Sequence, residues 1–171
     1  MLFVGSCHQS HRKTAKDNSF ILGKVIKVQD GDTYDLLRED NTTIRIRMEG
    51  IDAPEKGMPF YRVAKNYLGS LCLKQTVKVL KTTEDHHGRT VGYTYLNDGR
   101  ELSREMIKAG LAWHYKEYND EKELTNLEVE AQTARRGLWI DKNPMSPWEN
   151  RKLHRQGIST KEIFDIREGE E

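Results

Sequence analysis

The sequence predicts an α+β fold, mainly β, in which five short strands close a Greek-key barrel and three helices pack outside it. Five segments alternate apolar with polar residues or are rich in β-branched and aromatic residues, and turn signals separate them. One helical stripe follows the third segment and two follow the fifth, so the predicted order is β-β-β-α-β-β-α-α. With 171 residues, of which 36% are hydrophobic, the chain can bury one modest core, and we expect one domain with tails.

The first three strands form the start of the expected barrel, at residues 20–28, 33–38 and 42–48. In the third strand Ile44, Ile46 and Met48 alternate with polar residues, so they share the buried face. The acidic and Asn residues at 39–41 are a turn signal, which predicts a hairpin between the second and third strands.

Two more strands and three helices complete the expected domain. The strands are expected at residues 76–81 and 90–96, and the helices at residues 63–72, 102–109 and 124–134. Pro59 is placed to open the first helix, Gly110 to stop the second and Gly137 to stop the third. Five strands interrupted by a helix after the third suit a barrel of the oligonucleotide-binding type, the OB-fold.

The two ends of the chain differ from the patterned part, which spans residues 20–150. Residues 1–19 are expected to form a flexible tail, and residues 151–171 a charged and frayed C-terminal tail. The first seven residues resemble the end of a lipoprotein export signal with Cys7 as the acylated residue, and an unstructured start is the alternative. We therefore expect export to the cell envelope or the medium. A lipid anchor at Cys7 is one form that this export can take, and a cytoplasmic location is the open alternative.

Composition excludes several classes of protein. With 28 Lys and Arg against 27 Asp and Glu, the net charge is +1, so the chain does not bind nucleic acid as a bulk polycation. No apolar run approaches the roughly 18 residues of a transmembrane helix. The two cysteines cannot form a disulfide framework or a cysteine zinc site. No pattern indicates an oligomer, and we expect a monomer.

An acidic pair follows the first predicted strand. Asp30 and Asp32 flank Gly31, and paired carboxylates at such a turn can hold a hard cation through oxygen ligands. The alternative is an ordinary Asp-Gly turn.

A second polar cluster follows the third predicted strand. Asp52 and Glu55 lie on either side of Pro54, which keeps the preceding residue extended and projects side chains outward. Arg45 and Arg47 lie on the polar face of the strand. The alternative is a solvated hairpin edge with ordinary salt bridges.

A third cluster, Asp85 to Arg89, lies between the last two strands and contains the adjacent His86 and His87. Adjacent side chains point in different directions in an extended segment, so these histidines are a poor zinc pair, and solvated turn residues are the alternative. Together the three clusters supply carboxylates for a cation, a base for water and arginines for phosphate. This is the set that phosphodiester hydrolysis requires.

These motifs resemble the staphylococcal (micrococcal) nuclease family, also called thermonucleases. The matching segments lie between Gly23 and Trp148 and are VQDGDTYDL, IRIRMEGIDAPE, HGRTVGYTYL, MIKAGLAW, ARRGLW and NPMSPWE. The resemblance implies an OB-fold barrel with three helices. It also implies Ca²⁺-dependent hydrolysis of DNA and RNA, single-stranded or locally opened, with products that carry 3′-phosphate ends.

The resemblance assigns a cation site to four residues. Asp32 and Asp52 match the calcium carboxylates of the family, and Ala53 matches a ligand that uses its backbone carbonyl. The best-studied members have Thr at the position of Ala53, and a main-chain contact tolerates that change. Asp30 matches a nearby acid that supports the ligands from behind.

The resemblance also assigns catalysis to three residues. Glu55 matches the residue that activates or positions water, and Arg47 and Arg89 match the two arginines on the scissile phosphate. All of these positions keep the residue type that the family needs, which argues for activity. The competing hypothesis is a non-catalytic OB barrel that binds nucleic acid or a protein partner, which has no need of this acid–arginine set.

Four further residues are candidates for nucleotide binding. His86 and His87 stand where the best-studied member has Lys–Tyr, at a position that grips a terminal phosphate, so this grip is expected to differ here. Tyr115 and Tyr118 match tyrosines that flank the nucleotide, and packing against the outer helices is the alternative for each.

Overall fold

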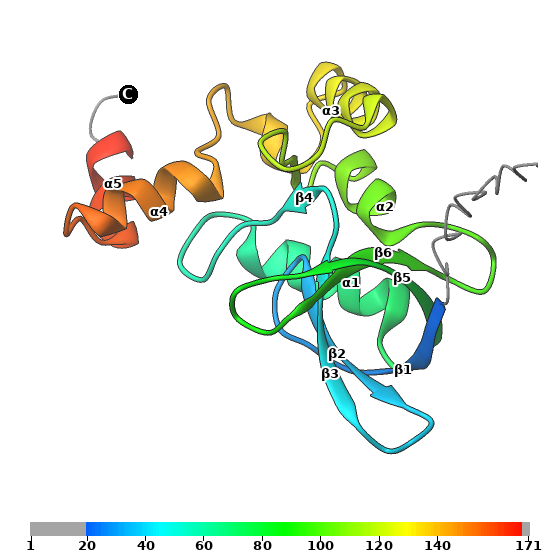
Figure 1. Cartoon of the computed structure of the whole chain (residues 1–171). Helices are drawn as coiled ribbons and strands as arrows, with labels where there is room; N and C mark the ends of the chain where they lie inside the picture. Colours follow the sequence, from blue (N-terminus) through cyan, green and yellow to red (C-terminus); the bar gives the residue numbers. More distant parts are fainter. Residues whose placement is uncertain (1–19, 169–171) are drawn as a thin grey trace, which may run out of the picture.

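The computed structural model describes residues 20–168, and its centre is a closed barrel of five strands (Figure 1). The barrel strands are β1 (Phe20–Val28), β2 (Thr33–Arg38), β3 (Thr43–Met48), β5 (Thr76–Glu84) and β6 (Thr90–Tyr95). They close in the order β1-β2-β3-β6-β5, with β1 antiparallel to both β2 and β5 and with β3 parallel to β6. The predicted α+β fold with a five-stranded barrel is confirmed. The N-terminal tail, residues 1–19, and Cys7 within it lie outside the described residues.

The predicted helices are present, with small shifts at their ends. They are α1 (Tyr61–Cys72), α2 (Leu102–Lys108) and α3 (Lys122–Thr133). Helix α1 begins two residues after Pro59, because Phe60 takes a left-handed conformation with φ of 63° at the N-cap. None of the helices within residues 20–168 is long and apolar enough to cross a membrane.

Three short elements have no counterpart in the prediction. They are β4 (Ile51–Asp52), β7 (Trp113–His114) and the 3₁₀ helix η1 (Gly137–Ile140). Strands β4 and β7 pair antiparallel outside the barrel, with Asp52 opposite Trp113. Two residues are too short to show a period of hydrophobicity, so sequence patterning cannot detect such strands.

The prediction that residues 151–171 form a frayed tail is wrong for the part of this segment that the structure describes. Helix α4 (Pro147–Arg155) extends into this segment and helix α5 (Thr160–Glu168) lies within it, and α4 contacts the loop that follows β4 (Figure 1). The start of α4 is a capping box, in which Ser146 and Glu149 bind each other's backbone, with Pro147 in the first turn. Ile163 of α5 is buried. Caps and a few apolar contacts therefore hold these helices without a long apolar stripe.

The core fills the barrel and the space under α1. Its barrel residues alternate along each strand as the period of two requires, so that Ile46 and Met48 are buried while Thr43 is exposed. The Tyr34 hydroxyl lies 2.7 Å from Thr94 Oγ1, which satisfies both polar groups inside the core. The hairpin predicted between the second and third strands is confirmed, with Tyr34 opposite Ile46.

Gly31, in the turn between β1 and β2, allows this turn to pack closely on α1 and on the loop after β4. A Cβ atom at Gly31 would lie 2.7 Å from Ala53 Cβ and 2.9 Å from Ala64 Cβ, closer than carbon atoms approach. We expect Gly31→Ala to lower the free energy of unfolding by about 1–3 kcal/mol, measured by urea denaturation. Gly69→Ala is the control, because a Cβ atom there meets nothing within 4 Å and Ala is favoured inside α1. Equal stabilities of the two variants would contradict this account.

Candidate active site

One rim of the barrel carries a cleft of about 880 Å³. It is lined by the turn between β1 and β2, the segment around β4, the turn between β5 and β6, the segment after β7, and α4. All of the site residues predicted from the sequence line this one cleft: Asp30, Asp32, Arg47, Asp52, Ala53, Glu55, His86, His87, Arg89, Tyr115 and Tyr118. The fold therefore brings together clusters that lie up to 88 positions apart in the chain.

The acidic turn between β1 and β2 is fixed by hydrogen bonds to its own backbone and to the loop after β4. The Asp32 amide donates to Asp30 Oδ1 at 3.1 Å, and the Ala53 amide donates to Asp32 Oδ2 at 2.7 Å. Thr33 Oγ1 donates to Asp32 Oδ1 at 2.8 Å. Asp32 is buried, and these bonds hold its carboxylate beside the backbone of Ala53.

Arg47 is the central cation of the cleft, and most of its donors bind the protein itself. Its Nη1 donates to the carbonyls of Met48 at 2.9 Å and Ile51 at 2.7 Å. Its Nη2 lies 3.1 Å from Asp52 Oδ1 and 3.3 Å from Asp32 Oδ2. The guanidinium therefore ties the end of β3 to β4 and joins the two acids that were predicted to hold a cation.

Arg89 is oriented by Asp85 at the base of the turn between β5 and β6. Asp85 Oδ1 accepts from the amides of His87 and Arg89, and Asp85 Oδ2 accepts from Arg89 Nε at 2.6 Å. The two Nη groups of Arg89 form no hydrogen bond or ion pair with any described residue. They are free to bind a ligand.

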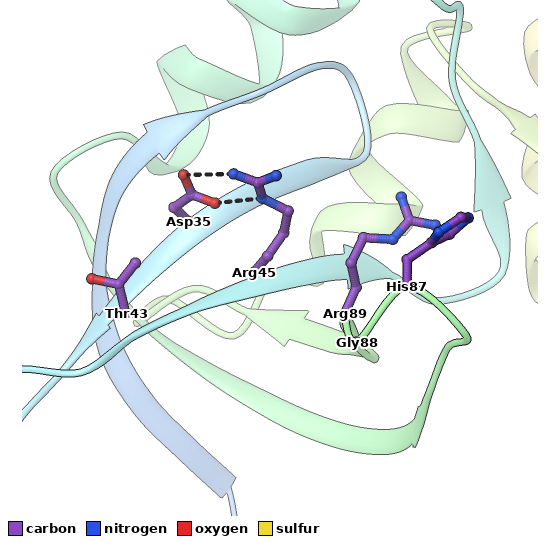
Figure 2. A pocket seen from close by; sticks show the side chains of 6 residues that line it. All are labelled: Asp35, Thr43, Arg45, His87, Gly88 and Arg89. Atoms are coloured by element: carbon purple, nitrogen blue, oxygen red, sulfur yellow. Dashed lines mark hydrogen bonds and ion pairs between the residues drawn. The ribbon is translucent and has the colours of Figure 1, made fainter.

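A smaller hollow of about 350 Å³ adjoins the cleft, and Arg89 and His87 line both (Figure 2). Its far wall is Arg45, whose guanidinium is turned to Asp35 with Nε 2.8 Å from Oδ1 (Figure 2). The rings of His86 and His87 lie against each other, with their centroids 3.8 Å apart. His87 therefore stands at the border between the cleft and this hollow, and His86 lies beside it in the cleft.

The two candidate tyrosines differ in their surroundings. The Tyr115 ring stacks on Trp148, with centroids 5.4 Å apart and planes within 4°. Tyr118 contacts Tyr115 at 4.9 Å and is 71% exposed, which leaves most of its surface open. Packing therefore accounts for one face of Tyr115, and Tyr118 offers the freer ring. Trp113 packs edge-on against Trp148.

Arg151 of α4 lies in the cleft, although the sequence analysis did not single it out. Its Nη2 lies 2.6 Å from Asp52 Oδ2, and its Nη1 lies 2.7 Å from Glu55 Oε1. The neighbouring Asn150, which is buried, donates to Glu55 Oε2 at 3.3 Å. Two signals were available: the motif NPMSPWE, which ends directly before Asn150, and the capping box at Ser146, which marks the start of a helix that can carry both residues into the site.

A known protein family matches more than half of this chain. The family model described as "Staphylococcal nuclease homologue" matches residues 45–141. The chain belongs to the staphylococcal nuclease family. The resemblance predicted from the sequence motifs is thereby confirmed.

Several relatives of this nuclease-family chain are between 35% and 46% identical to it over the aligned residues. An "uncharacterized endonuclease" of Escherichia coli O157:H7 is 39% identical over 128 residues, which cover 75% of this chain and 83% of the relative. A micrococcal nuclease of Shigella flexneri is 35% identical over 147 residues, with 80% and 84% covered. A staphylococcal-like nuclease of Arabidopsis thaliana is 46% identical over 113 residues, but these are only 35% of its length. The family and these relatives support a nuclease function.

Burial in the cleft of this nuclease-family chain disfavours the charged form of two acidic residues, Asp30 and Asp52. Burial raises the pKa of Asp30 to about 7, and the charge of Asp32 adds to the shift. Burial also raises the pKa of Asp52, although the hydrogen bonds from Arg151 oppose it. Burial opposes the charge of Arg151 as well, but its bonds to Asp52 outweigh this and raise the pKa of the guanidinium. Positive charge is therefore favoured beside Asp30 and Asp52.

The donors of the site suit a hard divalent cation, but they are not assembled as a ligand set. Within residues 20–168 no group of three or more His, Cys, Asp or Glu side chains is arranged to hold a metal ion. Asp32 and Asp52 offer carboxylate oxygens from two segments that the Ala53 amide joins. Both oxygens of Asp52 are in contact with arginines, Oδ1 with Arg47 and Oδ2 with Arg151. A cation on Asp52 therefore meets a carboxylate whose two oxygens arginines already contact.

Proposed function

We propose that this member of the staphylococcal nuclease family is a Ca²⁺-dependent phosphodiesterase. Its substrate would be single-stranded or locally opened DNA or RNA, and its products would carry 3′-phosphate ends. One observation supports this most strongly: a single cleft gathers the buried acids Asp32 and Asp52, Glu55 at its edge, and the free Nη groups of Arg89. A barrel that only binds its ligand has no need of this combination.

Asp32, Asp52 and the Ala53 carbonyl would hold the cation in this proposal. When bound, Ca²⁺ supplies positive charge that polarises a phosphoryl oxygen. Hard carboxylate and carbonyl oxygens are the ligands that Ca²⁺ prefers. Asp30 would not bind the cation directly. Its Oδ1 accepts a hydrogen bond from the Asp32 amide, which would stabilise the turn between β1 and β2 that carries Asp32.

Glu55 would orient the attacking water and accept its proton. Its side chain is 37% exposed at the edge of the cleft, and Asn150 and Arg151 fix its carboxylate by hydrogen bonds. Water can therefore reach a base whose orientation is already set. The Nη groups of Arg89 would bind the equatorial phosphate oxygens, where their fork matches the developing negative charge. Arg47 would contribute mainly through its charge, because its donors are held by carbonyls and carboxylates.

Nucleotide binding would use the rim of the cleft. The exposed ring of Tyr118 offers a stacking surface that tolerates any base. His86 and His87 would contact a neighbouring phosphate, because both line the cleft with Arg89 and His87 also lines the second hollow.

The first experiment is digestion of heat-denatured DNA at mildly alkaline pH with Ca²⁺, with Mg²⁺ or with EDTA, followed by analysis of the end groups. We expect fragments with 3′-phosphate ends in Ca²⁺ and none in EDTA. Absence of cleavage with either metal by folded protein, together with unchanged DNA binding in EDTA, would favour the non-catalytic barrel instead. Parallel digestion of RNA measures the preference between the two substrates.

A further inference from the structure

The cleft holds an arginine from outside the segment that matches the family model. Arg151 lies on α4, whereas the match covers residues 45–141. Its guanidinium binds Asp52 and Glu55 through separate nitrogens, at 2.6 and 2.7 Å. It thus bridges a proposed cation ligand and the proposed base, which come from β4 and the loop after it.

Arg151 lies on helix α4, and several contacts of this helix with the rest of the protein hold it in position. The capping box of Ser146 and Glu149 sets the start of α4. Trp148, one turn before Arg151, stacks on Tyr115, and Asn150 donates to Glu55. Because these contacts hold the backbone of α4, Arg151 loses little further freedom when it binds the acids. A surface arginine on a mobile segment would lack this advantage.

The position of Arg151 puts it in competition with a cation. The Arg151 guanidinium contacts both Asp52 oxygens, since Nη1 lies 3.4 Å from Oδ1 while Nη2 lies 2.6 Å from Oδ2. Its side chain is 35% exposed and that of Asp52 is 3% exposed, so solvent screens the pair only in part. A divalent cation on Asp52 would lie next to the like charge of Arg151, and the repulsion between the two would weaken these contacts.

We propose that Arg151 sets the cation affinity of the cleft by competing with the divalent cation for Asp52. This inference rests on the proposed function, because it takes Asp32 and Asp52 as the cation ligands. In the absence of a cation, the positive charge of Arg151 offsets the negative charges of Asp52 and Glu55, and its hydrogen bonds hold both carboxylates in position. Because coupling of this kind is reciprocal, a bound cation weakens the contact of α4 with the cleft to the same extent.

The test is calorimetric titration of Ca²⁺ into the full chain, after removal of divalent ions, for the unchanged protein and two variants. Arg151→Gln removes the competing charge, and we expect Ca²⁺ to bind at least about fivefold more tightly. Arg155→Gln is the matched control. Arg155 lies one turn further along α4 and lines the same cleft, but it forms no ion pair with any described residue. We expect its change to leave the Ca²⁺ affinity within about twofold, because it removes the same net charge without removing a competitor.

Thermal unfolding provides a second readout that does not depend on activity. Without divalent ions, Arg151→Gln is expected to unfold at a lower temperature than the unchanged protein, because Asp52 and Glu55 lose a partner. Added Ca²⁺ is expected to raise its unfolding temperature by more than that of the unchanged protein. If Arg151→Gln does not fold, Arg151→Lys keeps the charge but not the fork, and a smaller gain in affinity is expected.

The outcomes separate this inference from the function on which it rests. Equal Ca²⁺ affinity of the unchanged protein and Arg151→Gln, or weaker binding by the variant, would overturn the competition and leave the proposed function standing. An equal gain in Arg155→Gln would show an effect of net charge and would also overturn it. No Ca²⁺ binding by any of the three proteins would overturn the cation assignment and this inference together.

Discussion

Replacement of Glu55 by Gln is expected to lower kcat for hydrolysis of single-stranded DNA by about 10²-fold or more. The amide has the size of the carboxylate and can still accept the hydrogen bond from Arg151, so the cleft keeps its shape. It cannot take a proton from water, and the general base is lost. Steady-state kinetics with saturating Ca²⁺, together with an unfolding curve for each protein, measures the loss of rate and the stability separately.

Glu49→Gln is the matched control for the loss of the base. Glu49 lines the same cleft and has the same charge, but its Oε2 accepts from Thr82 Oγ1 at 2.5 Å and stands apart from the acid pair. We expect its kcat to stay within about threefold of the unchanged protein, because no proton transfer depends on it. Near-normal kcat in Glu55→Gln would remove Glu55 from the catalytic role.

Replacement of Arg47 by Ala is expected to cause the largest loss of stability, about 3–5 kcal/mol in the free energy of unfolding. The side chain is 14% exposed, and its removal leaves Asp32 and Asp52 without their shared partner and two carbonyls without a donor. Urea denaturation in EDTA measures this loss. Ca²⁺ is expected to recover part of it, since a cation on the two acids replaces the missing charge.

Arg45→Ala is the comparison for the Arg47 variant. Arg45 lies two residues earlier on β3, and its ion pair with Asp35 is on the outside of the barrel, where the arginine side chain is 51% exposed. Exposed pairs of this kind contribute up to about 1 kcal/mol, so a small change is expected. A loss for Arg47→Ala no larger than that for Arg45→Ala would show that Arg47 does not hold the acids together.

The barrel was predictable because its strands are long enough to show a period. Strand β3 is an example: Ile46 and Met48 are buried, and Arg45 and Arg47 lie on the other face, as alternation requires. Strands β4 and β7 escaped prediction because two residues carry no period, yet their pairing places Asp52 beside Trp113. Elements that depend on partners far along the chain leave little local signal.

The site was predictable in composition but not in its contacts. The motifs named the acids and the two arginines, and all of them line one cleft. The motifs did not show that Arg47 binds two backbone carbonyls, because side-chain direction depends on the packed fold. Arg151 was missed for another reason. It lies 96 positions after Glu55, on a short helix that the sequence marks by a capping box and not by a long apolar stripe.

Helix α4 also bears on where the working unit of this protein ends. The match to the family model ends at residue 141, before the helix begins. Yet α4 supplies one wall of the cleft and the Trp148 ring that covers Tyr115. A chain shortened to residues 45–141 would lose this wall, and it would also lose Asp30 and Asp32 from the opposite end of the sequence. The segment that matches the family model is therefore smaller than the unit that forms the cleft, and a survey that compares only this segment compares incomplete sites.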